Sequence, residues 1–350
     1  MIKYLGSKRT LLPVLRDIVQ RVTPPGGVVI DLFSGTSRVG HAMKSAGFAV
    51  RANDHNTYAA TLARCYVQAD AEDHLSGTEA LIEELNRLPG RPGYFTKTFC
   101  EDARFFHPKN GERVDAIRER IASMGLEPER EAVVLTALME AADRVDSTVG
   151  VQMAYLKQWA PRAHQDLRLR VPALLSRSAG GKSDAHQLDA ALAAEALEGD
   201  TIYLDPPYNQ HKYLGNYHIW ESLVRWDKPE VYGVANKRVD CRTRKSSFNS
   251  RREAGDAMAR VVAATQARNI ILSFSDEGFL GRAEIEAILS SRGEVAVIEM
   301  VGRRYVGAQI GVHNLKGERV GAAGATHNKE RIYVAGDMVQ RVRVTLGEGV

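Results

Sequence analysis

The chain has 350 residues, of which 44% are hydrophobic and 26% are charged. These ordinary proportions exclude disordered, collagen-like and low-complexity proteins, and the length suits one large domain or two smaller ones. No run approaches the ~18 apolar residues of a membrane-spanning helix, and the first residues contain no apolar signal segment, so we expect a cytoplasmic protein. The net charge of +4 does not by itself indicate a nucleic-acid partner.

The first part of the chain alternates between strand and helix patterns. Apolar residues share one helical face before a proline–glycine break, and short apolar runs then alternate with helical stretches. The predicted elements are a helix at 8–22, a strand at 28–33, a helix ending near Gly47, a strand at 48–54 and a helix at 57–69. This order predicts an α/β fold with a doubly wound parallel sheet.

The middle of the chain is less regular and has the character of an insertion. We expect a helix near 79–88, a strand that leads to Cys100, and a buried helix at 132–144. Residues 145–185 contain many Arg and Ser but few large aliphatic side chains, which favours an insertion over a sheet component. The alternating pattern then resumes, with strands expected at 201–205, 269–274, 294–300 and 331–335 and helices at 253–267 and 282–292, the last two strands pairing antiparallel.

The cysteines favour neither disulfides nor a metal site. Cys65, Cys100 and Cys241 are odd in number and far apart. This usage suits a reducing compartment, and the spacing matches no metal-binding pattern. We therefore expect no bound metal.

The turn after the first predicted strand has the features of a nucleotide-binding loop. Asp31 ends the strand and is followed by Leu-Phe-Ser-Gly-Thr-Ser-Arg-Val-Gly, which leads into a helix. Gly35 lets the backbone approach a ligand closely, and the helix N-terminus offers unpaired N–H groups. Asp54, at the end of the second strand, stands where an acid can bind ribose hydroxyls. Taken alone, these residues fit an ordinary tight turn equally well.

A second motif, Asp205-Pro206-Pro207-Tyr208, begins at the last residue of the strand predicted at 201–205. The two prolines make the turn rigid and remove two N–H donors. An exocyclic amine needs two hydrogen-bond acceptors, which the Asp205 carboxylate and the Pro206 carbonyl can provide. Tyr208 can stack on the ring that carries the amine. The alternative is a proline-rich turn with a capping Asp, which the nucleotide-type loop upstream disfavours.

Together with Tyr4-Leu5-Gly6-Ser7-Lys8, these motifs resemble those of the Dam-like, D12 class DNA adenine-N6 methyltransferases, which use S-adenosylmethionine. The resemblance covers nearly the whole chain. It implies a Rossmann-like doubly wound methyltransferase sheet with an inserted, mainly helical target-recognition segment. The motif order places this insertion at 106–190, between the two parts of the catalytic domain at 1–105 and 191–350.

The resemblance also implies roles for individual residues. Tyr4 would pack on the cofactor, Lys8 would pair with its carboxylate, Asp54 would bind its ribose and Asp102 its adenine. The implied cofactor-binding residues are Tyr4, Lys8, Asp31, Phe33, Ser34, Gly35, Asp54, Asp102 and Asp205, and the implied catalytic residues are Asp205, Pro206, Pro207 and Tyr208. The chain departs from the family pattern at Ser37, where a second glycine is usual, and at Tyr4, which is often Trp.

The predicted function is sequence-specific methylation of the N6 amine of an adenine flipped out of double-stranded DNA. We expect a role in restriction-modification or epigenetic marking, in a bacterial or phage-encoded protein associated with the nucleoid. A cognate restriction endonuclease would then be a functional partner rather than a necessary physical one. The alternatives are methylation of adenine in RNA and a catalytically inert DNA-binding relative.

A basic stretch after the second motif is a candidate for phosphate contacts. It contains one acid, Asp240, among many cations and small polar residues. We favour DNA contact over a merely solvated loop. Its basic residues are Lys237, Arg238, Arg242, Arg244, Lys245, Arg251 and Arg252.

Overall fold

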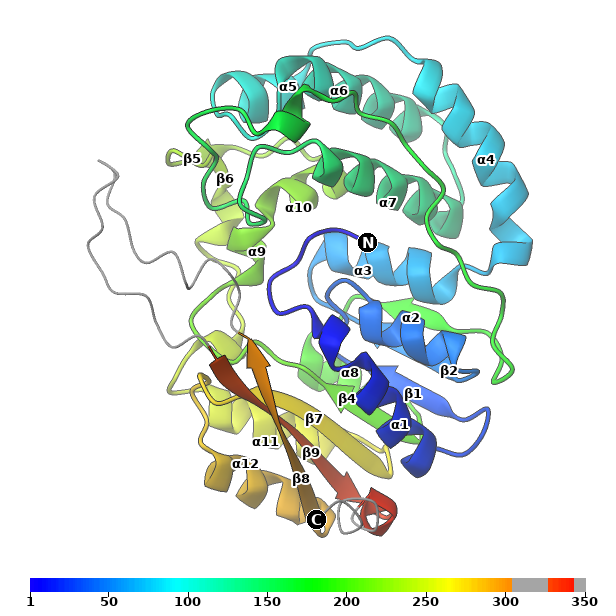
Figure 1. Ribbon diagram of the computed structural model, residues 1–350, viewed down its shortest axis with the longest axis vertical. Helices are drawn as coiled ribbons and strands as arrows, with labels where there is room; N and C mark the ends of the chain where they lie inside the picture. The colour runs from blue at the N-terminus through cyan, green and yellow to red at the C-terminus, as the bar shows by residue number, and fades with distance from the viewer. Residues whose placement is uncertain (304–326, 343–350) are drawn as a thin grey trace.

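The computed structural model describes residues 1–303 and 327–342 (Figure 1). A seven-stranded sheet in this part of the chain has the order β3-β2-β1-β4-β7-β9-β8. Neighbours from β3 to β7 are parallel, whereas β9 runs antiparallel to both β7 and β8. The strands are β1 (Val28–Asp31), β2 (Ala49–Asn53), β3 (Asp184–His186), β4 (Thr201–Leu204), β7 (Asn269–Ser275), β8 (Val295–Arg303) and β9 (His327–Gly336). The α/β prediction is confirmed, including the antiparallel pairing of the last two strands.

Helices cover both faces of the sheet, as the near-continuous burial along the inner strands β1, β4 and β7 requires. Val29 packs with α1 and α2 on one face, and its neighbour Ile30 packs with α8 and α11 on the other. The helices are α1 (Leu12–Val22), α2 (Arg38–Ser45), α3 (Thr57–Ala63), α4 (Ala71–Arg87), α5 (Tyr94–Thr96), α6 (Pro108–Ser123), α7 (Pro128–Arg144), α8 (Ala190–Ala196), α9 (Tyr213–Asn216), α10 (His218–Arg225), α11 (Ala254–Ala264) and α12 (Arg282–Leu289).

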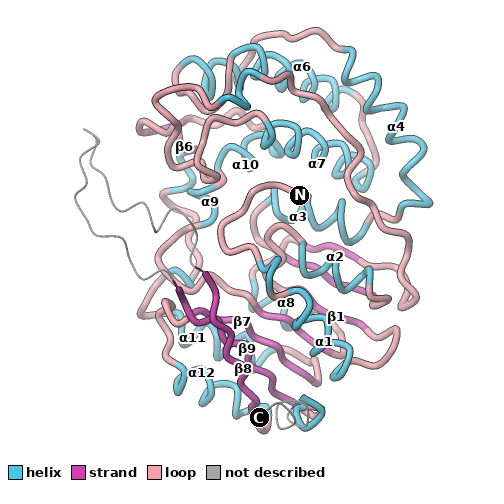
Figure 2. Tube along the Cα trace, viewed as in Figure 1, coloured by secondary structure: helices cyan, strands magenta, loops and turns pink. Residues whose placement is uncertain are grey.

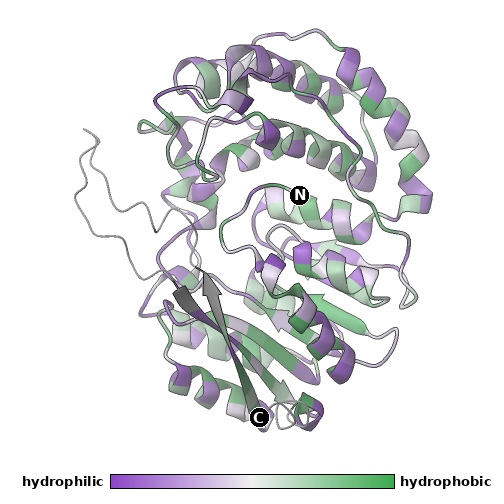
Figure 3. Cartoon of the chain, viewed as in Figure 1, coloured by the Kyte–Doolittle hydropathy of each residue, from purple (hydrophilic) through white to green (hydrophobic). Residues whose placement is uncertain are grey.

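A helical lobe has its own core beyond the sheet (Figure 2). Helices α3 to α7 and α10 bury a cluster that includes Phe95, Phe99, Phe106 and Trp220. Apolar residues concentrate on the strands and on the inner sides of the helices, and polar residues line the outer sides (Figure 3). A small hairpin, β5 (Val231–Tyr232) with β6 (Lys237–Arg238), lies beside α10 in this lobe. None of the helices in the described residues combines the length and apolar character needed to cross a bilayer.

The prediction of a strand before Cys100 is wrong. Tyr94–Thr96 is an α-helix that continues into a π-helical turn at Lys97–Glu101. Phe95 and Phe99 are four residues apart, so a helix places both in the core of the lobe. A short apolar run does not distinguish a buried strand from a helix by periodicity alone.

The insertion expected at 106–190 includes a strand of the sheet. Residues 184–186 form β3, which pairs in parallel with β2 through Arg51↔Asp184 and Asn53↔His186. This edge strand is polar and only half-buried, so it lacks the apolar signal of the inner strands. The chain therefore leaves the sheet after β2, builds most of the helical lobe, and returns to add β3 to β2.

Candidate active site at the ends of the parallel strands

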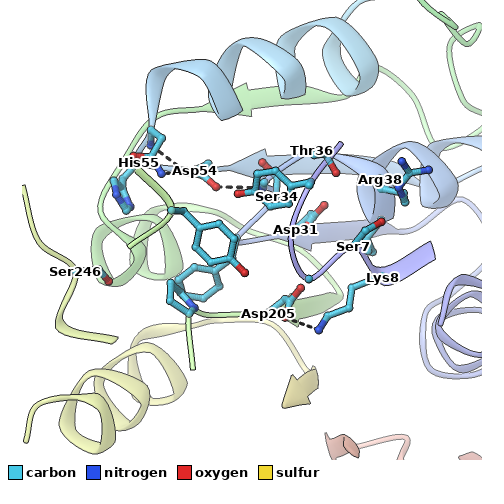
Figure 4. Close-up of a pocket in the computed structure, with 18 of the residues that line it drawn as sticks. Ser7, Lys8, Asp31, Ser34, Thr36, Arg38, Asp54, His55, Asp205 and Ser246 are labelled. Carbon is cyan, nitrogen blue, oxygen red and sulfur yellow. Dashed lines mark hydrogen bonds and ion pairs between the residues drawn. The ribbon is translucent and has the colours of Figure 1, made fainter. Parts of the chain in front are cut away.

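A cavity opens where β1, β2 and β4 end, at the carboxyl edge of the sheet (Figure 4). It encloses about 880 Å³ of space, part of which is open to solvent. The chain order reverses between β1 and β4, and such a switch point leaves a crevice beyond the strand ends. Among the predicted cofactor-binding residues, those that line the cavity are Tyr4, Lys8, Asp31, Phe33, Ser34, Gly35, Asp54 and Asp205.

The structure does not bring Asp102 to this cavity. It follows the π-helical turn of the helical lobe, where its half-exposed carboxylate pairs with Lys97 at 2.6 Å. Asp102 was placed in the site by a resemblance that assumed a sheet strand before it. Because the chain forms helical turns rather than a strand there, Asp102 does not lie at the carboxyl edge of the sheet.

The second motif sits directly after β4. Asp205 and Pro207 line the cavity, and Pro206 is buried in the turn. Tyr208 is not among the lining residues. Its ring centre lies 6.0 Å from that of Phe274, and its carbonyl accepts a hydrogen bond from the Phe279 N–H at 2.8 Å. The turn thus presents the Asp205 carboxylate to the cavity and anchors Tyr208 on the segment that follows β7.

Two backbone amides stabilise two further carboxylates of the site: that of Gly35, in the loop at residues 32–37 that follows β1 (the β1 loop), and that of Gly40, in α2. Asp31 Oδ2 accepts a hydrogen bond from Gly40 N at 2.9 Å, and Asp54 Oδ2 accepts one from Gly35 N at 3.1 Å. Burial raises the pKa of Asp31 to about 7 and also raises the pKa of Asp54. The loop is therefore held between the acid that ends β1 and the acid that follows β2.

Lys8, which lines the cavity, forms ion pairs with two carboxylates. Its Nζ lies 3.0 Å from Asp205 Oδ1 and 2.6 Å from Glu330 Oε1. Burial acts to lower the pKa of Lys8, but the two carboxylates raise it well above its ordinary value. The ammonium, which the resemblance assigned to the cofactor carboxylate, is here committed to protein acids.

Comparison with known proteins identifies the family. Residues 4–287 match the family described as D12 class N6 adenine-specific DNA methyltransferase. The chain belongs to this family. It is 31% identical to type II methyltransferase M.FokI of Planomicrobium okeanokoites over 324 residues, which cover 87% of this chain and 49% of M.FokI.

Two further relatives are a methyltransferase and a methylase by name. Type II methyltransferase M.NlaIII of Neisseria lactamica is 29% identical over 313 residues, which cover 86% of this chain and 92% of M.NlaIII. Modification methylase StsI of Streptococcus sanguinis is 28% identical over 321 residues, which cover 87% of this chain and 48% of StsI. The chain thus spans about half the length of M.FokI and of StsI, and most of the length of M.NlaIII.

Tyr4 belongs to an aromatic cluster at one wall of this methyltransferase cavity. Its ring stacks on Tyr217, with 4.6 Å between ring centres, and on Tyr213, with 5.2 Å. Its hydroxyl lies 3.2 Å from the Tyr58 hydroxyl. A Cβ placed on Gly35 would lie only 3.3 Å from the Tyr4 ring, so the loop and the cluster are in close contact.

Several lining residues were not predicted as site residues. Tyr213 lies only a few residues after the second motif, and this proximity in sequence is the signal that could have found it. Ser7 and Asn56 adjoin predicted residues and Arg38 belongs to the loop that follows the first strand, whereas Lys212 and Asn249 carry no local pattern. The lining residues outside the predicted cofactor-binding and catalytic sets are Gly6, Ser7, Thr36, Arg38, Val39, His55, Asn56, Tyr203, Lys212, Tyr213, Leu214, Arg244, Ser246 and Asn249. Of these, Arg244 was predicted only as a phosphate contact.

The basic stretch divides into internal and exposed cations. Arg238 is buried and pairs with Asp227 and Asp240, and Arg244 donates to the buried Glu221 at 2.7 Å. These two arginines hold the segment together. By contrast Arg242, Lys245, Arg251 and Arg252 are exposed and form no ion pair within residues 1–303 and 327–342.

The left-handed backbone of the β1 loop leads to a stability prediction. Ser37 has φ 59°, and its buried hydroxyl has no hydrogen-bond partner in the described residues. Ser37→Gly should stabilise the protein by about 1 kcal/mol, because relief of the left-handed strain exceeds the extra chain entropy of glycine. Gly35→Ala, at φ 50° beside Tyr4, should instead destabilise it by about 1–2 kcal/mol. Urea unfolding of both variants measures the difference, and a destabilised Ser37→Gly variant would contradict this reading of the loop.

Proposed function

We propose that this chain transfers a methyl group from S-adenosylmethionine to the N6 amine of an adenine at a specific sequence in double-stranded DNA. The main observation behind this proposal is that the Asp205 turn and the β1 loop line the same cavity. Family membership supplies the reaction class. The names of the relatives support a place in restriction-modification, with a restriction endonuclease as a functional partner.

The cavity fits S-adenosylmethionine in charge and in unfilled polar groups. Three acids, Asp31, Asp54 and Asp205, suit a ligand that carries a sulfonium and an ammonium. Ser34 lines the cavity, and its buried hydroxyl has no partner among the described residues. Asp54 and the Gly35 loop would hold the adenosine end, and Asp31 would face the cationic end. When bound, the cofactor supplies a methyl group that is already electrophilic.

The role of Asp205 follows from its free oxygen. Lys8 occupies Oδ1, and Oδ2 accepts no hydrogen bond within the described part of the chain. Oδ2 can therefore accept one N6 hydrogen while the Pro206 carbonyl accepts the other. Both bonds localise the amine lone pair and stabilise the positive charge that develops on nitrogen. Since the amine is otherwise buried in base pairing, the adenine must leave the stack, and Tyr208 would support it there.

We infer that DNA lies against the exposed cations of the basic stretch and against the helical lobe. Arg242 stacks over the Tyr232 ring at 4.0 Å, so the hairpin supports its guanidinium at the surface. Arg251 lies over Phe279 at 5.4 Å. These cations flank the segment that contributes Arg244, Ser246 and Asn249 to the cavity, so phosphates bound there would adjoin the target base.

Asp205→Ala should abolish methylation because it removes the amine acceptor, whereas DNA affinity should stay within about twofold. The wild-type chain, the variant and a matched control, Asp102→Ala, are expressed in a methylation-free bacterial host. Its DNA is then sequenced by a method that detects N6-methyladenine. We expect one short, fully modified motif with the wild type and with Asp102→Ala, and none with Asp205→Ala.

Near-normal modification by Asp205→Ala would disprove the catalytic assignment. Loss of modification with Asp102→Ala would restore that residue to the site. An unmodified genome with a wild-type protein that binds S-adenosylmethionine would disprove DNA as the sole and sufficient substrate, and would point to RNA or to a missing subunit.

Removing exposed cations should weaken DNA binding in a salt-dependent way. The double variant Arg242→Ala/Lys245→Ala should reduce the slope of log K against log salt concentration by up to about 2, since each lost phosphate contact contributes roughly 0.9. Arg16→Ala/Arg260→Ala removes the same charge from exposed positions on α1 and α11 and should leave the slope unchanged. Equal slopes for both double variants would exclude phosphate contact by Arg242 and Lys245.

A further inference from the structure

Glu330 reaches the active site because β9 is antiparallel. The parallel strands end at Asp31, Asn53, Leu204 and Ser275, so an antiparallel strand must begin at the same edge. Glu330 lies near the start of β9 and is paired in register with Ser275 of β7. A residue from late in the chain is thereby placed beside the turn that follows β4.

Alternation along β9 directs Glu330 to Lys8. Its neighbour Arg331 points to the opposite face, where it pairs with Glu299 of β8 at 2.9 Å. Glu330 instead pairs with Lys8, which begins the 3₁₀ turn before α1. Its side chain is 13% exposed, compared with 35% for Glu299, so Glu330 is the less solvated of the two.

Glu330, Lys8 and Asp205 form a three-membered cluster with two negative groups and one positive group. Lys8 Nζ bridges the acids at 2.6 Å and 3.0 Å, and its side chain is only 9% exposed. An isolated Lys8–Asp205 pair would be neutral, and the ammonium would withdraw charge from the carboxylate that must accept the amine. The second carboxylate restores a net negative charge next to the position where positive charge develops.

We propose that Glu330 is a positioning residue for methyl transfer: it holds Lys8 so that Asp205 keeps one oxygen free and the cluster keeps its net negative charge. The inference rests on the proposed function of Asp205. Glu330 itself touches neither substrate nor cofactor in this role and acts through Lys8. The sequence around Glu330 carries no motif that would have indicated it.

The charges around Asp205 predict in which direction each change to the cluster should shift the pKa of Asp205. Burial raises the pKa of Asp205 to about 6; Lys8 lowers it and Glu330 raises it. Asp31 of β1, Tyr203 of β4 and Tyr213 of α9 also interact electrostatically with Asp205. Removing the charge of Glu330 should therefore lower the pKa of Asp205, and removing the charge of Lys8 should raise it.

The first experiment measures the pKa of Asp205 without any reaction. The protein is labelled with ¹³C at the aspartate carboxyl carbons, and the Asp205 signal is assigned by its loss in Asp205→Asn. Glu330→Gln should move the Asp205 titration to lower pH, and Lys8→Gln should move it to higher pH. Glu330→Asp, which keeps the charge, and the matched control Glu299→Gln on β8 should leave it in place.

The second experiment links the cluster to catalysis. Single-turnover methylation of unmethylated plasmid DNA with tritiated S-adenosylmethionine should be about tenfold slower in Glu330→Gln. The acid limb of the pH–rate profile of this variant should move to lower pH. DNA affinity should be unchanged, and Glu330→Asp should recover most of the rate. A merely structural residue would reduce the active fraction without moving the acid limb.

An Asp205 titration that is identical in the wild type and in Glu330→Gln would overturn the inference, whether or not the chain methylates DNA. If Glu330→Gln does not fold, the opposite shift in Lys8→Gln and the unshifted Glu330→Asp still test the cluster. A wild-type protein with the expected titrations but without methyl transfer would instead refute the proposed function alone.

Discussion

Parallel pairing of β1, β2 and β4 is the constraint on which the site depends, because it ends three strands at one edge of the sheet. Each of these strands ends in or is followed by an acid: Asp31, Asp54 and Asp205. Carboxylates buried so close together are costly unless they are paired or hydrogen-bonded. The costs are offset locally, by the amides of Gly40 and Gly35 for the first two and by the Lys8 ammonium for the third.

Segments from both ends of the described chain meet at this edge. The N-terminal segment runs between the helical lobe and the sheet, with Lys3 paired to Asp146 at 2.7 Å on the lobe side and Lys8 paired to Asp205 on the sheet side. From the other end, β9 inserts between β7 and β8 and contributes Glu330. The Asp205 turn after β4, to which we assign catalysis, is therefore stabilised by residues that are remote from it in sequence.

A buried carboxylate links the helical lobe to the basic stretch. Glu221 of α10 accepts hydrogen bonds from the Tyr58 N–H and the Thr57 hydroxyl, at the first turn of α3, and also binds Arg244. The helix begins three residues after Asp54, so one side chain connects the lobe, the edge of the proposed cofactor site and the proposed DNA-binding segment. In such an arrangement, DNA bound to the exposed cations and cofactor bound near Asp54 would share a rigid support.

The amino-acid sequence by itself determined the strands with strong apolar signals, the two motifs and the family, because these depend on neighbouring residues in the chain. Asp31, Asp54 and Asp205 were predicted because each ends or directly follows such a strand, and the parallel order then required them to converge. Polar β3 and the helix at Phe95 and Phe99 were missed because pairing with β2 and packing in the lobe, not local periodicity, decide their conformation. Tertiary structure alone separated Asp102 from the site, turned Arg238 and Arg244 inward and brought Glu330 to Lys8. These outcomes depend on through-space ion pairs between residues distant in sequence or on the path of the backbone, and no local pattern encodes them.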